Sequence, residues 1–316
     1  MSTSIKEKLT QYYLKFRKSN YLHRFNKGMP KKTEKKLSEF ILKDTLNNQD
    51  EYCSYKLKNN IVTSFVFSKR MNDYGENILP TEMVIQDGYI TKSIIEKEII
   101  KIKLFYKDKD KYKKIVLPAY STQNKLIQLY NELGFSFTGN TYLGQVTDAL
   151  KYYRNKNLLC PQGVIIRTGT KTDLTKIFKL ARICHGSDKT SRINRTVSSF
   201  LKNKEISDIY KKSIRDKSIF VITRKSRIIG YIVIALSYVK GGNKNNIRRN
   251  TLIGDIGVHP DYWGNGLANI LYNQAFQFMK SEKIKIYLGS SSTKSVMNLS
   301  KKLNRKSFLS VYYIDI

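Results

Sequence analysis

The order of strand-like and helix-like segments, which runs through once and then starts again, constrains the fold of this chain most. In the first half, two strand-like runs precede a charged helical stretch, a short strand and a helix, at 60–70, 79–90, 92–114, 115–120 and 121–133. The second half repeats this order at 218–239, 250–260, 267–280, 285–289 and 292–303. Strands that alternate with helices predict an α/β fold with a mixed sheet. The repetition indicates a tandem duplication.

Further segments flank the two repeats. Two basic helices, a strand, two helical stretches and a last strand are expected at 5–25, 33–46, 164–169, 170–184, 196–214 and 308–316. A polar connector that contains a proline, 153–163, separates the halves. A chain of 316 residues is long enough for two cores. We therefore expect two domains, 1–158 and 159–316.

The charge balance is far from even, with 58 Lys and Arg against 25 Asp and Glu, a net charge of +33. Such a charge attracts polyanions, and it fits either a compositional bias or an anionic partner such as a nucleic acid. The three cysteines and three histidines show no metal-ligand spacing, so neither a disulfide framework nor a metal site is expected. No apolar run suits a membrane span or a signal peptide, which predicts a cytoplasmic location.

The most informative short stretch lies within 257–280, where a glycine-rich turn leads directly into an amphipathic helix. The first N–H groups of a helix have no intrahelical partner, and this end carries a partial positive charge. Glycines let a ligand approach the backbone closely. The N–H groups of residues 264–268 are thus suited to bind one anion, such as a phosphate.

The same stretch resembles the acetyl-CoA site of the GCN5-related N-acetyltransferase (GNAT) superfamily. In that family a strand ends in Val-x-Pro and a Gln/Arg-x-x-Gly-x-Gly/Ala loop follows, as Val258-His259-Pro260 and 263–268 do here. Gly266 and Ala268 match the small positions, whereas Trp263 replaces the usual Arg or Gln. The likeness extends over 164–316.

The resemblance implies that acetyl-CoA or another acyl-CoA is the cofactor. Backbone N–H groups of the loop would bind its diphosphate, and the edge of the preceding strand would bind its pantetheine arm. The cofactor-binding residues implied are Ile256, Gly257, Val258, Trp263, Gly264, Asn265, Gly266, Leu267 and Ala268.

The N-terminal half resembles the family at one other place, where Tyr130 precedes Leu133-Gly134-Phe135. Its equivalent of the phosphate loop, 85–94, has a single glycine and β-branched residues. We therefore expect tandem GNAT-like domains in which the N-terminal copy, about 36–150, is degenerate and serves as a scaffold or acceptor platform.

The catalytic residues are less clearly marked. Asp255 is the acid on the strand before the loop, and it either receives a proton, positions a water, or pairs with a lysine. The family's tyrosine acid for the departing thiolate aligns with Ser300, a poorer proton donor. Tyr287, Tyr312 and Tyr313 are alternatives for that role, and Tyr313 is included with Asp255 and Ser300 as a candidate.

These features predict an acetyl-CoA-dependent N-acyltransferase that moves an acetyl group to a primary amine on a small molecule, a peptide or a protein lysine. One alternative is an aminoacyltransferase that uses charged tRNA, which the charge would suit. Another is a catalytically decayed adaptor that binds nucleic acid or protein. The intact glycine loop favours the first hypothesis, and Ser300 favours the last.

Overall fold

The structure is a computed structural model of the chain. It describes residues 2–25, 29, 31–46, 51–68, 71–73, 76–106, 112, 114–156, 158–187, 204–238, 248–291 and 293–315. The chain forms two compact units: an N-terminal unit of 1–139 with 308–316, and a C-terminal unit of 140–307. The boundaries of the units lie at 139/140 and 307/308, whereas the two sequence halves meet at 158/159.

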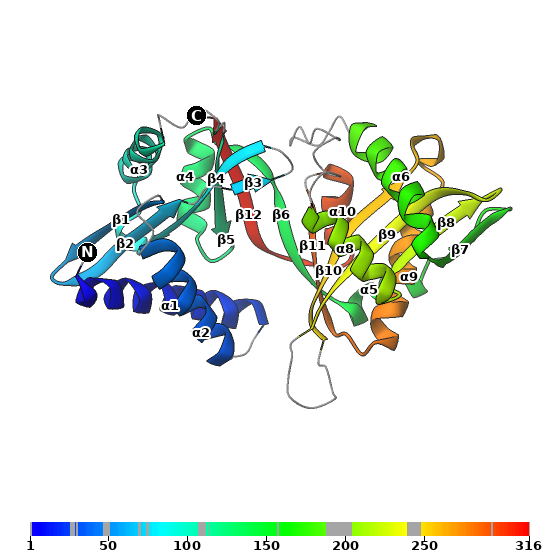
Figure 1. The fold of residues 1–316 in the computed structure, drawn as a ribbon, viewed down its shortest axis with the longest axis horizontal. Coiled ribbons are helices and arrows are strands. Elements are labelled where there is room, and N and C mark those ends of the chain that lie inside the picture. Colours follow the sequence, from blue (N-terminus) through cyan, green and yellow to red (C-terminus); the bar gives the residue numbers. More distant parts are fainter. Residues whose placement is uncertain are drawn as a thin grey trace. The chain divides into compact units, whose positions relative to one another are not determined.

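The N-terminal unit contains a sheet with strand order β1-β2-β4-β5-β12, and β3 pairs with β4 (Figure 1). The strands are β1 (Tyr52–Lys58), β2 (Ile61–Ser68), β3 (Met71–Asp73), β4 (Glu76–Ile85), β5 (Lys114–Tyr120) and β12 (Lys306–Asp315). The helices are α1 (Thr3–Phe25), α2 (Lys31–Phe40), the π-helical turn η1 (Ile41–Leu46), the 3-10 turn η2 (Asp87–Tyr89), α3 (Lys92–Phe105) and α4 (Asn124–Glu132). Within the described part of this sheet, β4 and β5 run parallel and the other pairs are antiparallel.

The C-terminal unit contains a sheet with strand order β6-β11-β10-β9-β8-β7. Its strands are β6 (Ser136–Gln145), β7 (Val164–Thr168), β8 (Ile219–Arg224), β9 (Arg227–Tyr238), β10 (Arg248–Val258) and β11 (Ile286–Ser291). Its helices are α5 (Val146–Arg154), η3 (Lys171–Asp173), α6 (Leu174–Ser187), α8 (Lys204–Arg215), η4 (Pro260–Tyr262), α9 (Leu267–Ser281) and α10 (Lys294–Lys302). Here β10 and β11 are the parallel pair. The predicted mixed α/β class is confirmed.

Each sheet includes a strand from the other half of the sequence. β6 begins in the N-terminal unit, and its residues 140–145 pair with β11 in the C-terminal unit. β12 begins in the C-terminal unit, and its residues 309–315 pair with β5 in the N-terminal unit. We refer to this arrangement as the strand exchange.

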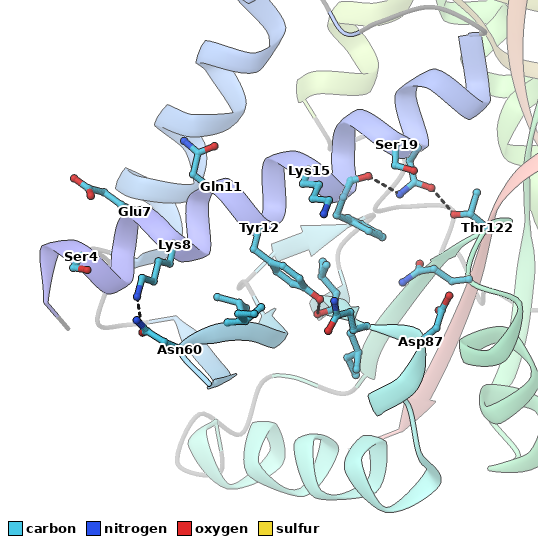
Figure 2. Close-up of a pocket in the computed structure, with 18 residues that line it drawn as sticks. Ser4, Glu7, Lys8, Gln11, Tyr12, Lys15, Ser19, Asn60, Asp87 and Thr122 are labelled. Carbon is cyan, nitrogen blue, oxygen red and sulfur yellow. Dashed lines mark hydrogen bonds between the residues drawn. The ribbon is translucent and has the colours of Figure 1, made fainter. Parts of the chain in front are cut away.

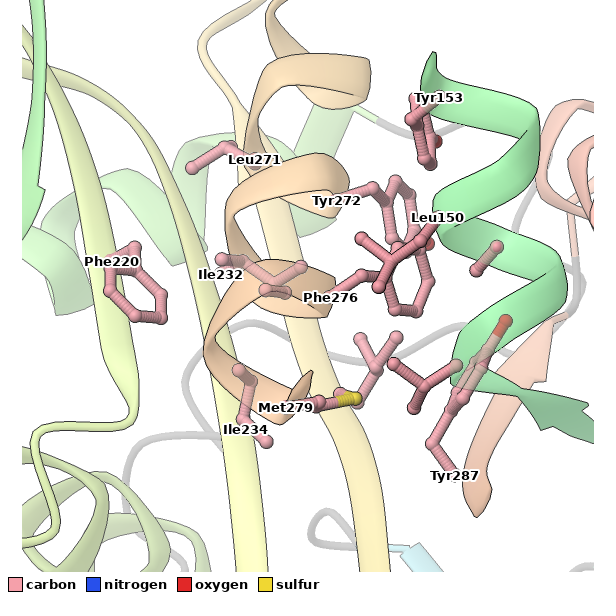
Figure 3. Close-up of a cluster of buried hydrophobic side chains, with 14 of the residues drawn as sticks. Leu150, Tyr153, Phe220, Ile232, Ile234, Leu271, Tyr272, Phe276, Met279 and Tyr287 are labelled. Carbon is pink, nitrogen blue, oxygen red and sulfur yellow. The ribbon is translucent and has the colours of Figure 1, made fainter. Parts of the chain in front are cut away.

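The core of the C-terminal unit fixes the helix that follows the glycine turn. Leu271 and Met279 of α9 are fully buried on one helix face against Ile232 and Ile234 of β9, and α5 contributes Tyr153 (Figure 3). The spacing of the α9 residues is helical and that of the β9 residues is alternating, as each element requires. Burial of each such side chain contributes roughly 1.5–3 kcal/mol. α9 is thus held rigidly on the sheet.

Two predicted helices differ from those found. The helix expected over 92–114 ends at Phe105, because Tyr106 turns into the core, where its hydroxyl donates to the Ser68 carbonyl and accepts from the Tyr52 N–H. Of the helical region expected at 196–214, residues 196–203 lie outside the described part of the chain, and α8 forms the rest. No helix of the described residues is both long and apolar enough to span a membrane.

Candidate functional site

The parallel strands of the C-terminal unit part after two residue pairs. Leu252 pairs with Leu288 and Ile253 with Gly289, and β10 then continues to Val258 with no further register to β11. We call the place beyond Ile253 and Gly289 the fork. In an α/β sheet, ligands typically bind where neighbouring strands part at their carboxyl ends.

A turn with two left-handed residues connects β10 to α9. After η4, Trp263 is extended, Gly264 has a φ of 82° and Gly266 a φ of 73°. Side chains other than glycine rarely adopt these angles. A Cβ at either glycine would have no neighbour within 4 Å. The turn is therefore open to a ligand on the side where side chains would lie.

The N-terminal end of α9 is uncapped. Its N-cap is Gly266, which has no side chain, and the Gly266 carbonyl accepts from the N–H groups of Asn269 and Ile270. Among the described residues no acceptor faces the N–H groups of 264–268. By contrast, α10 begins with a side-chain cap from Thr293. The partial positive charge of α9 is thus unopposed at its N-terminus, and an acceptor-rich anion fits there.

The indole of Trp263 is tied to the end of β10. Its Nε1 donates to the Val258 carbonyl at 2.7 Å, and the thiol of Cys184 donates to the same oxygen at 3.3 Å. Trp263 is nevertheless 54% exposed. Burial raises the pKa of the Cys184 thiol to about 12, with a contribution from the Asp255 charge, so this thiol is inert. The Val258 carbonyl thus already has two hydrogen-bond donors within the protein.

Asp255 follows a β-bulge that separates it from Ile253. Its Oδ2 accepts a hydrogen bond from Tyr231 of β9 at 2.7 Å and one from Tyr210 of α8 at 2.5 Å. Both tyrosines are buried, and burial followed by the Asp255 charge raises the pKa of Tyr231 well above its ordinary value. Two hydroxyl donors on one oxygen fix the orientation of this carboxylate beside the fork.

Gly257 makes the contact between Tyr231 and Asp255 possible. It lies opposite Tyr231 in the β9–β10 pair, and a Cβ there would come within 2.5 Å of the tyrosine ring and 2.9 Å of the Cys184 sulfur. The ring therefore needs the space above this glycine. The sequence indicated Gly257 only as a cofactor contact, and its packing role emerges from the structure.

The other two predicted catalytic residues have surroundings of their own. Ser300 is fully buried, and its hydroxyl donates to the Val296 carbonyl within α10 and accepts from Arg305. Tyr313 belongs to the N-terminal unit, where the Lys114 ammonium lies 5.3 Å from its ring centre. Tyr313 is thus not among the residues that the C-terminal unit brings together. No group of three described His, Cys, Asp or Glu residues could hold a metal ion.

Sequence reasoning missed Arg305, a buried cation directly before β12. Its Nε donates to the Tyr287 hydroxyl at 2.9 Å, and its guanidinium lies 5.0 Å from the ring centre of Tyr287 and 5.4 Å from that of Tyr272. Burial alone would lower the pKa of Arg305, but these tyrosines raise it. Its place in the sequence could have indicated it, because Arg305 aligns with the phenylalanine in the Leu-Gly-Phe ending of the other half.

The N-terminal unit closes its own equivalent of the fork. β4 and β5 pair as far as Pro80 and Val116 and then part. The buried amide of Gln123 spans the parted strands, because its Nε2 donates to the Met83 carbonyl at 3.2 Å and its Oε1 accepts from the Tyr120 N–H at 2.9 Å. Side chains of the protein thus occupy this place.

A pocket of about 930 Å³ lies in the same unit, against α1 and the ends of β2 and β4 (Figure 2). Tyr12, Lys15 and Ser19 line it from α1, and Asp87 and Thr122 line it from the other side.

The helix α3, which is the equivalent of α9, begins with a hydroxyl cap: the Thr91 side chain accepts a hydrogen bond from the Ile94 N–H. The unit therefore lacks the open turn of its counterpart, as expected for a degenerate copy.

Comparisons with known proteins agree with this geometry. Residues 188–300 match the model of the acetyltransferase (GNAT) family. A GCN5-related N-acetyltransferase from Sphaerobacter thermophilus superposes with a TM-score of 0.58 at 11% identity, over 88% of this chain and 85% of that one. A tandem GNAT protein from the clavulanic acid biosynthesis pathway gives 0.50 at 10% identity, over 82% and 81%. No curated protein matches by sequence.

At these identities the superpositions establish the fold alone, and the family match concerns the part of the chain that carries the open turn and the fork. Residues 188–300 therefore match the GNAT family, and the chain has a fold similar to that of a tandem GNAT protein.

Proposed function

We propose that this protein is an N-acetyltransferase whose C-terminal unit binds acetyl-CoA, or another acyl-CoA, and acetylates a primary amine. The observation that carries the proposal is the set of N–H groups at 264–268 that have no acceptor among the described residues. Two of these residues, Gly264 and Gly266, have left-handed backbone angles and free space around them. This arrangement fits a diphosphate.

The chain's own residues have distinct roles in this proposal. The turn holds the diphosphate, and the exposed indole of Trp263 lies beside it. The acyl-CoA supplies the acetyl group as an activated thioester. Asp255, oriented by Tyr210 and Tyr231, accepts the proton of the acceptor amine directly or through a water. Its negative charge also attracts the acceptor while that amine is still an ammonium ion.

The acceptor is a small molecule, a peptide or a protein lysine. The net charge of +33 disfavours basic acceptors at long range unless the local carboxylate attracts them. It leaves an anionic partner, such as a nucleic acid, as an additional possibility that salt-dependent retention would detect.

The chain's single tryptophan makes a direct binding test possible, because Trp263 lies at the turn itself. Acetyl-CoA should change the tryptophan emission of the wild type in a saturable way. Gly266→Val should weaken binding at least about tenfold, a loss of roughly 1.4 kcal/mol. Release of CoA thiol in the presence of a panel of primary amines then tests turnover.

Gly134→Val is the matched control, since Gly134 also has a positive φ, 71°, and free space around it but lies in the N-terminal unit. Both variants introduce the same backbone strain, and only Gly266→Val should affect binding. Equal binding by both variants would contradict the assigned turn. Retention of charged tRNA without acyl-CoA binding would favour the tRNA-dependent aminoacyltransferase instead.

A further inference from the structure

The guanidinium of Arg305 is a buried cation that lacks a complete set of partners. The residue is 7% exposed, and its Nη2 has no hydrogen-bond partner among the residues that the structure describes. No ion pair of the described residues includes it. A buried donor without a partner destabilises a protein, and more so when it is charged. Such a group marks a place where a water, an ion or a ligand atom can bind.

The guanidinium lies at the base of the fork. A Cβ on Gly289, the last residue of β11 that pairs with β10, would be 3.2 Å from Nη1 of Arg305. The same nitrogen donates to the Ser300 hydroxyl at 3.4 Å. A larger side chain at either position would take up the space of the guanidinium. The small residues 289 and 300 therefore let this cation reach the point where the two strands part.

The turn that ends at Arg305 has an equivalent in the N-terminal unit, which ends at Phe135 and contains no cation. There Phe135 donates its N–H to the Tyr130 carbonyl at 3.0 Å, as Arg305 does to the Ser300 carbonyl at 2.9 Å. The turn is the same in both units, since Gly134 precedes Phe135 with a φ of 71° and a residue with a φ of 51° precedes Arg305. Tyr130 and Phe135 form an ordinary aromatic pair.

The two units thus differ in both positions. The unit with the closed fork keeps two aromatic residues, and the unit with the open anion-binding turn has Ser300 and Arg305. This correlation within one chain links the buried cation to the ligand that the open unit binds.

We propose that Arg305 is a catalytic residue whose Nη2 donates a hydrogen bond to the thioester sulfur and stabilises its negative charge as it leaves. The inference rests on the proposed function. The amine nitrogen forms a bond to the carbonyl carbon, the carbon–sulfur bond breaks, and its electron pair stays on sulfur. The amine proton goes to Asp255 or to water. Arg305 keeps its own proton throughout, so it acts by charge and not as an acid.

Bound CoA reports on this contact without any acceptor. In the wild type, the thiol of bound CoA should ionise about one pH unit or more below that of free CoA, because a cation within about 4–6 Å favours the thiolate. The ultraviolet absorbance of the thiolate, measured against pH, gives this value. Arg305→Gln should abolish the shift, and Arg305→Lys should retain part of it. An unshifted thiol in the wild type would overturn the proposal even if no variant folds.

Turnover provides the second measurement. Arg305→Gln should lower kcat about 100-fold or more, while the Kd for acetyl-CoA from Trp263 emission changes less than about threefold. Tyr287→Phe, which removes a hydrogen-bond partner but leaves the cation, should retain most of the thiol shift. Wild-type kcat in Arg305→Gln would overturn the role of Arg305 alone. Absence of CoA binding by the wild type would overturn the proposed function and this inference together.

Discussion

Glu82 and Asp255 occupy equivalent places in the two units: each stands two residues beyond the last residue of its strand that pairs with the parallel neighbour. Each carboxylate accepts a hydrogen bond from a helix tyrosine, Tyr13 or Tyr210. In the N-terminal unit, Arg17 of the same helix also binds Glu82, at 3.1 Å. The duplicated acid has thus become part of a structural ion pair in one unit.

Loss of that ion pair should destabilise the protein. Arg17 binds both Glu82 of β4 and the Tyr120 hydroxyl of β5, so Arg17→Ala removes one hydrogen bond from each of two partly buried groups. The free energy of unfolding from urea titration should fall by about 1–3 kcal/mol. The control is Lys18→Ala, which removes a more exposed pair with Glu34 and should change it by less than about 1 kcal/mol. Equal effects would argue against the bridging role.

The packing above Gly257 makes a second prediction. Gly257→Ala places a methyl group 2.5 Å from the Tyr231 ring, so the ring must move away from Asp255. We expect a loss of about 1–3 kcal/mol in stability, measured by thermal or urea unfolding, together with lower acetyl transfer. Gly254→Ala on the same strand meets its nearest atom at 3.7 Å and should change neither property appreciably. Full activity in Gly257→Ala would show that the orientation of Asp255 is unimportant.

The carboxylate of Asp173 leads to a prediction about how the stability of the fold depends on pH. Hydrogen bonds from Arg167, followed by those from Thr170, hold the pKa of Asp173 well below its ordinary value. A carboxyl whose pKa is lower in the folded state stabilises the fold above its unfolded pKa, about 3.9, and this contribution is lost as the pH falls through the folded-state pKa. Asp173→Asn should therefore lower the free energy of unfolding by about 1–3 kcal/mol at neutral pH.

The difference between wild type and Asp173→Asn should shrink in urea titrations at pH values below about 4. Asp208 provides the control, because its carboxylate is 3.8 Å from Lys211 and its side chain is 59% exposed. Asp208→Asn should have little effect at either pH. A difference for Asp173→Asn that grows on acidification would contradict the assigned sign.

The strand exchange makes a further prediction at Gly144 of β6. A Cβ there would lie 2.4 Å from the Tyr287 ring, which faces it across the β6–β11 pair. Gly144→Ala should lower the melting temperature, because the Tyr287 ring must move to make room for the methyl group. Normal stability would show that Tyr287 can move without consequence. The substitution lies in the N-terminal half of the sequence but should act on the C-terminal unit.

Local features of the sequence predicted the site best. Gly264 and Gly266 are required by the backbone angles of the turn itself, and the apolar spacing of α9 follows from helical geometry. The alternation of strands and helices likewise predicted the fold class. In each case the physical cause lies within a few residues of the pattern.

Features that depend on distant residues were missed. β6 contains glycines and polar residues in place of a β-branched alternation, and it is a strand because β11 pairs with it. Arg305 looks like one more surface cation in a basic chain, and its burial depends on Tyr272, Tyr287 and Ser300. The contact between Tyr231 and Asp255 likewise requires a glycine on a neighbouring strand.

The exchange of β6 and β12 also sets an order for folding during synthesis on the ribosome. The sheet of the N-terminal unit ends in a strand that follows the whole C-terminal unit in the chain. Domains usually fold in turn as they are synthesised. Here β5 keeps an unpaired edge until residues 309–315 have been translated, so the domain that is made first is completed last.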